Sequence, residues 1–252
     1  MKILASYNIK GGVGKTAAAV NLAYLAAGEG ARTLVWDLDP QGAATYYFRV
    51  KPKVKGGTRK LLKKRADVDD RVRGTDYPQL DLLPSDFSYR NMDIVLDEAK
   101  KPRRRLARLL EPLAGEYDYV FLDCPPSISL LSEAVFGAAD ALLVPIIPTT
   151  LSLRTLDQIL AFRAENGFEQ VAVLPFFSMV DRRKKLHRQI LQTLPADCPE
   201  LLSAQIPYAS DVEQMGVQRE PLACYAPRSR SALAYAALWR EIRGRLHESL
   251  PS

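Results

Sequence analysis

The chain contains 252 residues, of which 47% are hydrophobic and 25% are charged, and these are ordinary proportions for a folded globular protein. They exclude disordered and collagen-like classes, and no apolar run reaches the roughly 20 residues needed to span a bilayer. The formal net charge of +6 favours an acidic partner, while the three widely spaced cysteines predict reduced thiols in a cytoplasmic protein.

Short apolar runs alternate with helical patterns along the chain. In chain order, the expected strands are residues 2–7, 33–36, 80–83, 117–122, 141–147 and 171–177. The expected helices are residues 15–28, 89–99, 103–113, 130–138, 151–165, 185–194 and 231–247. This alternation predicts one α/β domain, residues 1–252, with a mostly parallel twisted sheet and helices on both faces. Ligands bind beyond the carboxyl ends of the strands in such sheets.

A glycine-rich loop joins the first expected strand to the first expected helix, and residues 8–16 read NIKGGVGKT. The glycines let backbone N–H groups wrap around phosphate oxygens, and the helix N-terminus adds the positive end of its dipole. Lys15 is expected to reach the β- and γ-phosphates, and the Thr16 hydroxyl to ligate Mg²⁺. The residues predicted to bind ATP are Gly11, Gly12, Val13, Gly14, Lys15, Thr16 and Ala17.

The loop departs from the usual pattern G-x-x-x-x-G-K-[ST], because Ile9 occupies the position of the first glycine. Instead, Lys10 precedes two glycines. This variant resembles the loop of the deviant Walker A ATPases, the group of P-loop NTPases that holds the ParA and MinD proteins. The resemblance implies that Lys10 crosses the interface of an ATP-sandwiched homodimer and stabilises charge on the partner's nucleotide, as an arginine finger does.

Two strand ends carry the carboxylates that would complete the site. Residues 36–42 read WDLDPQG, and alternation along the strand points Asp37 and Asp39 the same way. This segment resembles the family's switch segment D-x-D-P-Q-G, which implies that Asp39 orients the attacking water and Asp37 contacts a Mg²⁺-bound water. Asp123 begins a segment that reads DCPP and is similar to the family's Walker B end, which implies that it reaches Mg²⁺ through water. Strand-end carboxylates also serve as turn formers, which is the alternative interpretation.

The resemblance extends over essentially the whole chain, through the segments VPIIP at 144–148, MVDR at 179–182 and IPY at 206–208. It implies that backbone near Pro207 and Tyr208 holds the adenine. It also implies a non-specific surface for double-stranded DNA, because phosphate contacts need only cations on one face. The residues predicted for that surface are Arg182, Arg183, Lys184, Arg188 and Arg219, and a merely solvated charged face is the alternative. Residues 49–65, rich in lysine and arginine, are expected to form an exposed basic excursion.

Three functions remain open on these patterns. The favoured one is a slow Mg²⁺-dependent ATPase, associated with the nucleoid, that positions a plasmid, a chromosome origin or a protein assembly under stimulation by a ParB-like or adaptor protein. The second is a membrane-cycling ATPase similar to MinD, but no stable membrane anchor is visible. The third is a metabolic or metal-cluster ATPase similar to the nitrogenase iron protein, for which the isolated Cys198 and Cys224 supply no cluster ligands.

Overall fold

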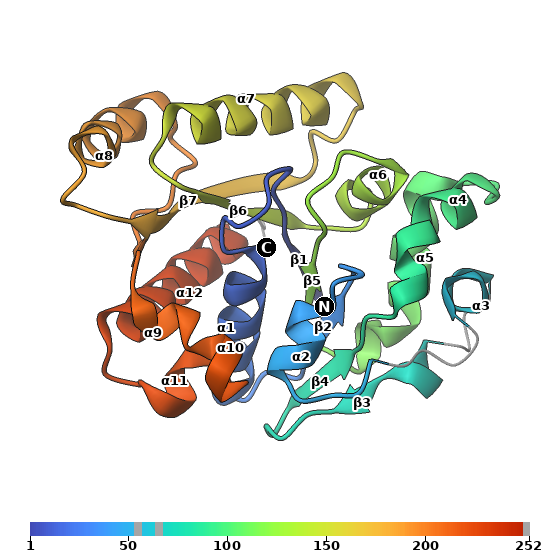
Figure 1. Ribbon diagram of the computed structural model, residues 1–252. Coiled ribbons are helices and arrows are strands. Elements are labelled where there is room, and N and C mark those ends of the chain that lie inside the picture. Colours follow the sequence, from blue (N-terminus) through green and yellow to red (C-terminus); the bar gives the residue numbers. More distant parts are fainter. Residues whose placement is uncertain (53–56, 64–67, 249–252) are drawn as a thin grey trace.

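The strands form one sheet, seen in a computed structural model that describes residues 1–52, 57–63 and 68–248 (Figure 1). They are β1 (Lys2–Ser6), β2 (Thr33–Asp37), β3 (Arg73–Gly74), β4 (Leu80–Leu83), β5 (Tyr119–Asp123), β6 (Ala141–Ile146), β7 (Ala172–Val180) and β8 (Gln205–Pro207). Their order across the eight-stranded sheet is β3-β4-β2-β5-β1-β6-β7-β8. The described strand pairs are parallel except β3 with β4 at one edge. The prediction of a mostly parallel sheet is confirmed.

Helices cover both faces of this sheet (Figure 1). The helices are α1 (Lys15–Gly28), α2 (Ala43–Tyr47), α3 (Gly57–Lys63), α4 (Met92–Asp97), α5 (Arg105–Leu110), α6 (Leu130–Phe136), α7 (Thr150–Glu165), α8 (Lys185–Asp197), α9 (Ser210–Glu213), α10 (Met215–Gln218), α11 (Leu222–Tyr225) and α12 (Arg230–Glu248). Alternate strand residues serve the two faces: Leu4 packs with α1 and α12, whereas Ile3 packs with α4 to α7. The predicted α/β class is therefore confirmed.

The central strands are apolar along nearly their whole length because both faces are covered. Every residue of β2 is buried, and Leu34, Val35 and Trp36 have no exposed surface. Helix α1 is rich in alanine, which has the highest helix propensity and lets the helix lie close to the sheet. Each fully buried leucine in these layers contributes roughly 1.5–3 kcal/mol. This rigid centre fixes the strand ends on which the candidate site is built.

The differences from the sequence prediction lie in short elements. Strands β3 and β8 contain two and three residues, which are too few to show a hydrophobic period. Strand β7 also continues beyond the expected end at Phe177, to Val180. The expected helix 103–113 is an α-helix only over α5, with 3₁₀ turns at Pro102–Arg104 and Glu111–Gly115 on either side.

The expected basic excursion at residues 49–65 is exposed at its described basic residues, such as Arg59 and Lys60, but the apolar residues in its middle part are buried. Residues 57–63 form α3, in which Leu61 and Leu62 are buried in the same core as α4. Burial of the two leucine side chains stabilises this helix against the core, although the residues around them are positively charged. The basic residues at 53–56 and 64–65 lie outside the described residues.

The strand order brings the predicted motifs to one edge of the sheet. Strand β1 lies between β5 and β6, and the chain leaves β1 directly into the glycine-rich loop. The register pairs Ser6 with Asp123 and Asp37 with Asp123, so the last residues of β1, β2 and β5 are neighbours. The carboxyl ends of these strands therefore surround the start of α1.

Candidate functional site

The loop between β1 and α1 depends on glycines in the left-handed region. Gly12 has φ 70° and Gly14 has φ 97°, values that cost other residues about 1–2 kcal/mol. A Cβ atom on Gly14 would also lie 2.8 Å from the Ser178 Oγ, whereas a Cβ on Gly12 would meet nothing within 4 Å. Gly14 is therefore required by both backbone conformation and packing, and Gly12 by conformation.

Asn8 fixes the start of the loop. Its Nδ2 donates to the Pro145 carbonyl at 2.9 Å, and its Oδ1 accepts from the Lys10 amide at 2.9 Å. The side chain is buried at 1% exposed surface. Sequence reasoning included Asn8 in the loop without assigning it a role, and the partner on β6 could not be foreseen from a local pattern. The start of the loop is thus tied to β6, the strand next to β1.

Lys15 lies buried at the first turn of α1. Its Nζ donates to the Lys10 carbonyl at 2.9 Å, and its own carbonyl accepts from the Ser6 hydroxyl at 2.8 Å. Burial lowers the pKa of the Lys15 ammonium, and the nearby Asp123 carboxylate opposes this shift. A partly desolvated ammonium beside a helix N-terminus interacts strongly with phosphate oxygens. The structure places Lys15 where such a group would lie.

Asp37 and Asp123 are buried register partners at the ends of β2 and β5. The Asp37 Oδ2 accepts from the Thr45 amide at 2.7 Å and from the Thr45 hydroxyl at 2.6 Å. Burial raises the pKa of Asp37 to about 6, although the two Thr45 hydrogen bonds favour the charged form. The Asp37 side chain is therefore anchored to α2 rather than free to move.

Asp123 has no comparable anchor. Within the described ranges, neither of its carboxylate oxygens accepts a hydrogen bond of normal geometry. Burial raises the pKa of Asp123 well above its usual range, Asp37 raises it further, and the nearby Thr16 hydroxyl opposes the rise. A buried carboxylate without partners is costly, and a divalent cation would favour its charged form.

These residues fit Mg²⁺. The ion prefers oxygen ligands and usually keeps several waters while it binds one or two protein groups and substrate phosphates. The Thr16 hydroxyl would hold it directly, and Asp123 and Asp37 would reach it through water. No group of three or more His, Cys, Asp or Glu side chains in the described part of the chain could hold a metal by itself. The geometry therefore suits an ion that arrives with phosphate groups.

Asp39 lies just beyond β2 and, unlike Asp37, lines the cavity at the start of α1. Its Oδ1 accepts from the Gln41 amide at 2.9 Å, and its carbonyl accepts from the Ser85 hydroxyl at 2.5 Å. Gly42, with φ 65°, ends this segment and directly precedes α2. The two carboxylates of the switch segment thus differ: one is sequestered and one is accessible.

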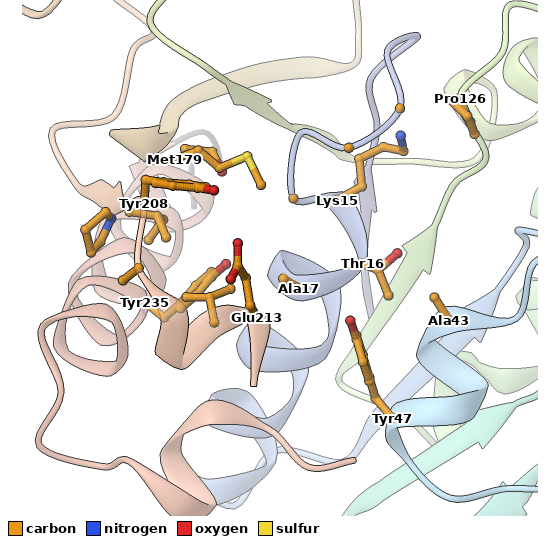
Figure 2. Close-up of a pocket in the computed structure, with 18 of the residues that line it drawn as sticks. Lys15, Thr16, Ala17, Ala43, Tyr47, Pro126, Met179, Tyr208, Glu213 and Tyr235 are labelled. Atoms are coloured by element: carbon orange, nitrogen blue, oxygen red, sulfur yellow. The ribbon is translucent and has the colours of Figure 1, made fainter. Parts of the chain in front are cut away.

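The cavity has a volume of about 330 Å³ and extends from the glycine-rich loop to the end of β8 (Figure 2). Gly11, Gly12, Gly14, Lys15, Thr16 and Ala17 line one end. Pro207 and the exposed Tyr208 line the other end, beside Met179. Val13 is buried below the loop at 1% exposed surface and does not line the cavity. A phosphate-binding end and a partly apolar end thus share one hollow.

Several cavity residues were missed by sequence reasoning. Tyr47 enters from α2, Glu213 from α9 and Tyr235 from α12, as Figure 2 shows. Ser178 on β7 supports the loop beside Gly14. Tyr47 follows closely after the switch segment, whereas Glu213 and Tyr235 are far from the phosphate-site motifs in the sequence, and no local signal marks any of the three as a cavity residue.

The residues predicted to bind DNA fall into two separate groups. Arg182, Arg183, Lys184 and Arg188 are exposed where β7 leads into α8, and the Arg188 guanidinium donates to the carbonyls of Arg182 and Arg183. Arg183 also forms a bidentate pair with Asp181, which offsets part of the positive charge.

Arg219 belongs to another part of the molecule. It follows α10, which lies beside α2 and apart from α8 (Figure 1). Its guanidinium carbon lies 4.3 Å from the centre of the Tyr46 ring, and its Nε donates to the Tyr46 carbonyl at 3.2 Å. One subunit therefore does not bring Arg219 together with the other predicted DNA-binding residues.

The chain is similar to known proteins over most of its length. A family model described as an AAA domain matches residues 1–166. The sporulation initiation inhibitor protein Soj of Bacillus subtilis is 31% identical over 247 residues, which cover 96% of this chain and 98% of Soj. The chromosome partitioning protein ParA of Caulobacter vibrioides is 32% identical over 261 residues, which cover 97% of this chain and 95% of that protein.

A solved structure is similar over the whole fold. Cobyrinic acid a,c-diamide synthase from Mycobacterium smegmatis, with bound ADP and magnesium, has a TM-score of 0.81 and 27% sequence identity. The likeness covers 99% of this chain and 96% of that chain.

Proposed function

Because this chain belongs to the AAA domain family of P-loop ATPases that includes Soj and ParA, we propose that it is a Mg²⁺-dependent ATPase that dimerises around ATP, binds duplex DNA non-specifically and positions a cargo. The observation that carries this proposal is the single cavity in which the variant loop, Lys15 and the accessible Asp39 meet. The cargo is a plasmid, a chromosome origin or a protein assembly.

The residues of the cavity divide the work of hydrolysis. The loop amides and Lys15 bind the phosphate chain, and Asp39 orients the attacking water. Mg²⁺, held by Thr16 and approached by Asp37 and Asp123 through water, would supply charge neutralisation on the β- and γ-phosphates. This proposed role of Asp39 is supported by its position, because Asp39 lines the cavity and Asp37 does not. Turnover is slow until a partner completes or rigidifies this arrangement.

Lys10 has a different role in this proposal. Its carbonyl and amide are used within the loop, but no described residue accepts a hydrogen bond from its ammonium group. That leaves the charge available to a second subunit that closes face to face across ATP. Lys10 would then stabilise the partner's phosphates, and dimerisation would depend on ATP.

The dimer provides the DNA-binding surface. One subunit presents few exposed cations at the start of α8, and a closed dimer doubles them. Each neutralised phosphate adds about 0.9 to the slope of log affinity against log salt, so doubling the number of neutralised phosphates strongly increases affinity. The protein would then be cytoplasmic and associated with the nucleoid. A ParB-like or adaptor protein attached to the cargo would stimulate hydrolysis and release the DNA.

A gel-shift series tests the proposal. The protein is mixed with duplexes of unrelated sequence in ATP, ADP or no nucleotide, at rising salt concentrations. We expect similar affinity for all duplexes with ATP and much weaker binding otherwise. Asp39→Ala should retain the ATP-dependent shift and lose phosphate release. Absence of any ATP-dependent shift on every duplex would reject the DNA-binding role.

The membrane-cycling alternative is addressed by the same samples. None of the helices in residues 1–52, 57–63 and 68–248 has both the length and the apolarity needed to cross a bilayer. In α12 the apolar residues Leu238, Ile242 and Leu246 are buried against the sheet, so they are occupied within the fold. ATP-dependent pelleting with anionic liposomes, without a DNA shift, would favour that alternative.

A further inference from the structure

Tyr47 occupies an unusual place between the switch segment and the nucleotide cavity. It is the last residue of α2, and α2 begins directly after Gly42. Its ring is half-buried and lines the cavity together with Thr16, Ala17 and Tyr235. Figure 2 shows its hydroxyl directed toward the first turn of α1, where Thr16 and Ala17 lie.

The Tyr47 hydroxyl is available to a ligand. No described residue forms a hydrogen bond with it, although its neighbours along α2 are well connected. Burial raises the pKa of the phenol, and the Asp123 carboxylate raises it further, so the group stays protonated and can donate. A neutral donor that faces the N-terminus of α1 adds to the loop amides that bind anions there.

Its neighbour Tyr46 provides a natural contrast. The Tyr46 side chain is 49% exposed and lies outside the cavity, under the Arg219 guanidinium. The two tyrosines are adjacent in sequence and belong to the same short helix, yet only Tyr47 lines the cavity.

The position of Tyr47 along the cavity indicates which part of a nucleotide it meets. Lys15 and Asp39 mark the end where the terminal phosphates bind, and Pro207 and Tyr208 mark the opposite end. Ala17 lies between Lys15 and Tyr208 in Figure 2, and the Tyr47 hydroxyl is directed toward the turn of α1 that carries Ala17. The phosphate next to the nucleoside is the part of the ligand that passes this point.

We propose that Tyr47 is a nucleotide-binding residue whose hydroxyl donates a hydrogen bond to an oxygen of the α-phosphate. This inference rests on the proposed nucleotide site. The contact also joins the ligand to the switch segment: Thr45, two residues before Tyr47, holds Asp37, and the Tyr46 amide donates to the Gly42 carbonyl at 2.9 Å. The contact exists with ADP as well as ATP, so it holds α2 in place after the γ-phosphate has left.

The test compares Tyr47→Phe with the matched control Tyr46→Phe by calorimetry with Mg²⁺ and each of ATP, ADP and 2′-deoxy-ADP. Loss of a hydrogen bond to a charged acceptor should weaken binding of all three nucleotides to Tyr47→Phe by the same factor, on the order of tenfold. Tyr46→Phe should bind them as the wild type does.

Other outcomes overturn the assignment in distinguishable ways. Equal affinity of Tyr47→Phe and wild type removes Tyr47 from the site. A weaker affinity for ATP alone would place the contact on the γ-phosphate, and a weaker affinity for ADP but not for 2′-deoxy-ADP would place it on the ribose. If the wild type bound no nucleotide, both the proposed function and this inference would fail.

A second measurement covers the case in which Tyr47→Phe does not fold. The otherwise unchanged chain is labelled with 3-fluorotyrosine at position 47 or at position 46. ADP should shift the fluorine resonance at position 47 much more than that at position 46. Equal or absent shifts would overturn the inference.

Discussion

The glycine-rich loop and the basic residues at the start of α8 are built by opposite means. The loop depends on two left-handed glycines and on Lys15, whose side chain is 7% exposed. The basic residues have exposed side chains, and of these Arg183 pairs with Asp181 while Arg188 donates to a nearby carbonyl. A site of the first kind recognises the shape of its ligand, whereas a surface of the second kind responds to charge density and salt.

Substitution of Lys15 is expected to have the largest effect, and it tests whether the glycine-rich loop is a specific phosphate-binding site. Lys15→Ala removes an ammonium that would make charge-assisted hydrogen bonds to the phosphates, and we expect ATP affinity to fall roughly a thousandfold. Lys10→Ala, in the same loop, should retain binding and lose ATP-dependent dimerisation. Calorimetry and light scattering measure the two effects, and unchanged ATP affinity in Lys15→Ala would remove Lys15 from the phosphate site.

Charge reversal tests the basic residues at the start of α8. The pair Arg182→Glu and Arg188→Glu should lower DNA affinity roughly a hundredfold near physiological salt and reduce the salt slope by about 0.9 for each phosphate that is no longer neutralised. ATP affinity should be unchanged. Since the structure separates Arg219 from this group, Arg219→Glu is measured on its own by the same gel shifts. If only Arg219→Glu weakened binding, the DNA surface would lie beside α2 instead.

Gly14→Ala tests whether the glycine-rich loop, unlike the exposed basic residues, also contributes to folding stability. The positive φ and the approach of Ser178 predict a decrease of about 2 kcal/mol in the free energy of unfolding. Gly12→Ala adds a Cβ in open space and should cost less. Lys184→Ala, in the exposed group, should change stability by no more than about 0.5 kcal/mol. Urea denaturation without nucleotide measures all three, and equal costs for the two glycines would argue against the Ser178 contact.

The last prediction concerns the pH dependence of stability. The pKa of Asp37 is about 6 in the folded chain against 3.8 for the ordinary group, so the folded state holds this proton more tightly. Stability from this group is therefore present at low pH and is lost as pH rises from about 4 to about 6. Asp37→Asn should flatten that part of the profile, measured by denaturation at a series of pH values. The free energy of unfolding of Asp37→Asn should still depend on pH to some extent, because the buried Asp123 remains. If the pH dependence of Asp37→Asn equalled that of the wild type, Asp37 would not titrate in this range.

The sequence sufficed for the central strands and the long helices because continuous apolar runs mark the former and apolar residues at helical spacing mark the latter. It placed the loop and the strand-end carboxylates together because parallel strands bring their carboxyl ends to one edge. It could not separate the environments of Asp37 and Asp39, since that difference depends on Thr45 and on the start of α2. Nor could it assign Tyr47 and Tyr235, which enter the cavity from helices that no local motif connects.

One consequence follows from where β8 lies. Among the strands of the described residues, this three-residue strand pairs with β7 alone, at the edge of the sheet, and Pro207 has no amide hydrogen to donate. Local opening needs less free energy at such an edge than at β1 in the centre. The cavity is thus bordered by the stable centre of the sheet at one end and by its less stable edge at the other. We therefore expect the contacts of the adenine base to break before those of the phosphates when a nucleotide dissociates. Amide hydrogen exchange around β8 and α9 would then slow on nucleotide binding more than exchange in β1.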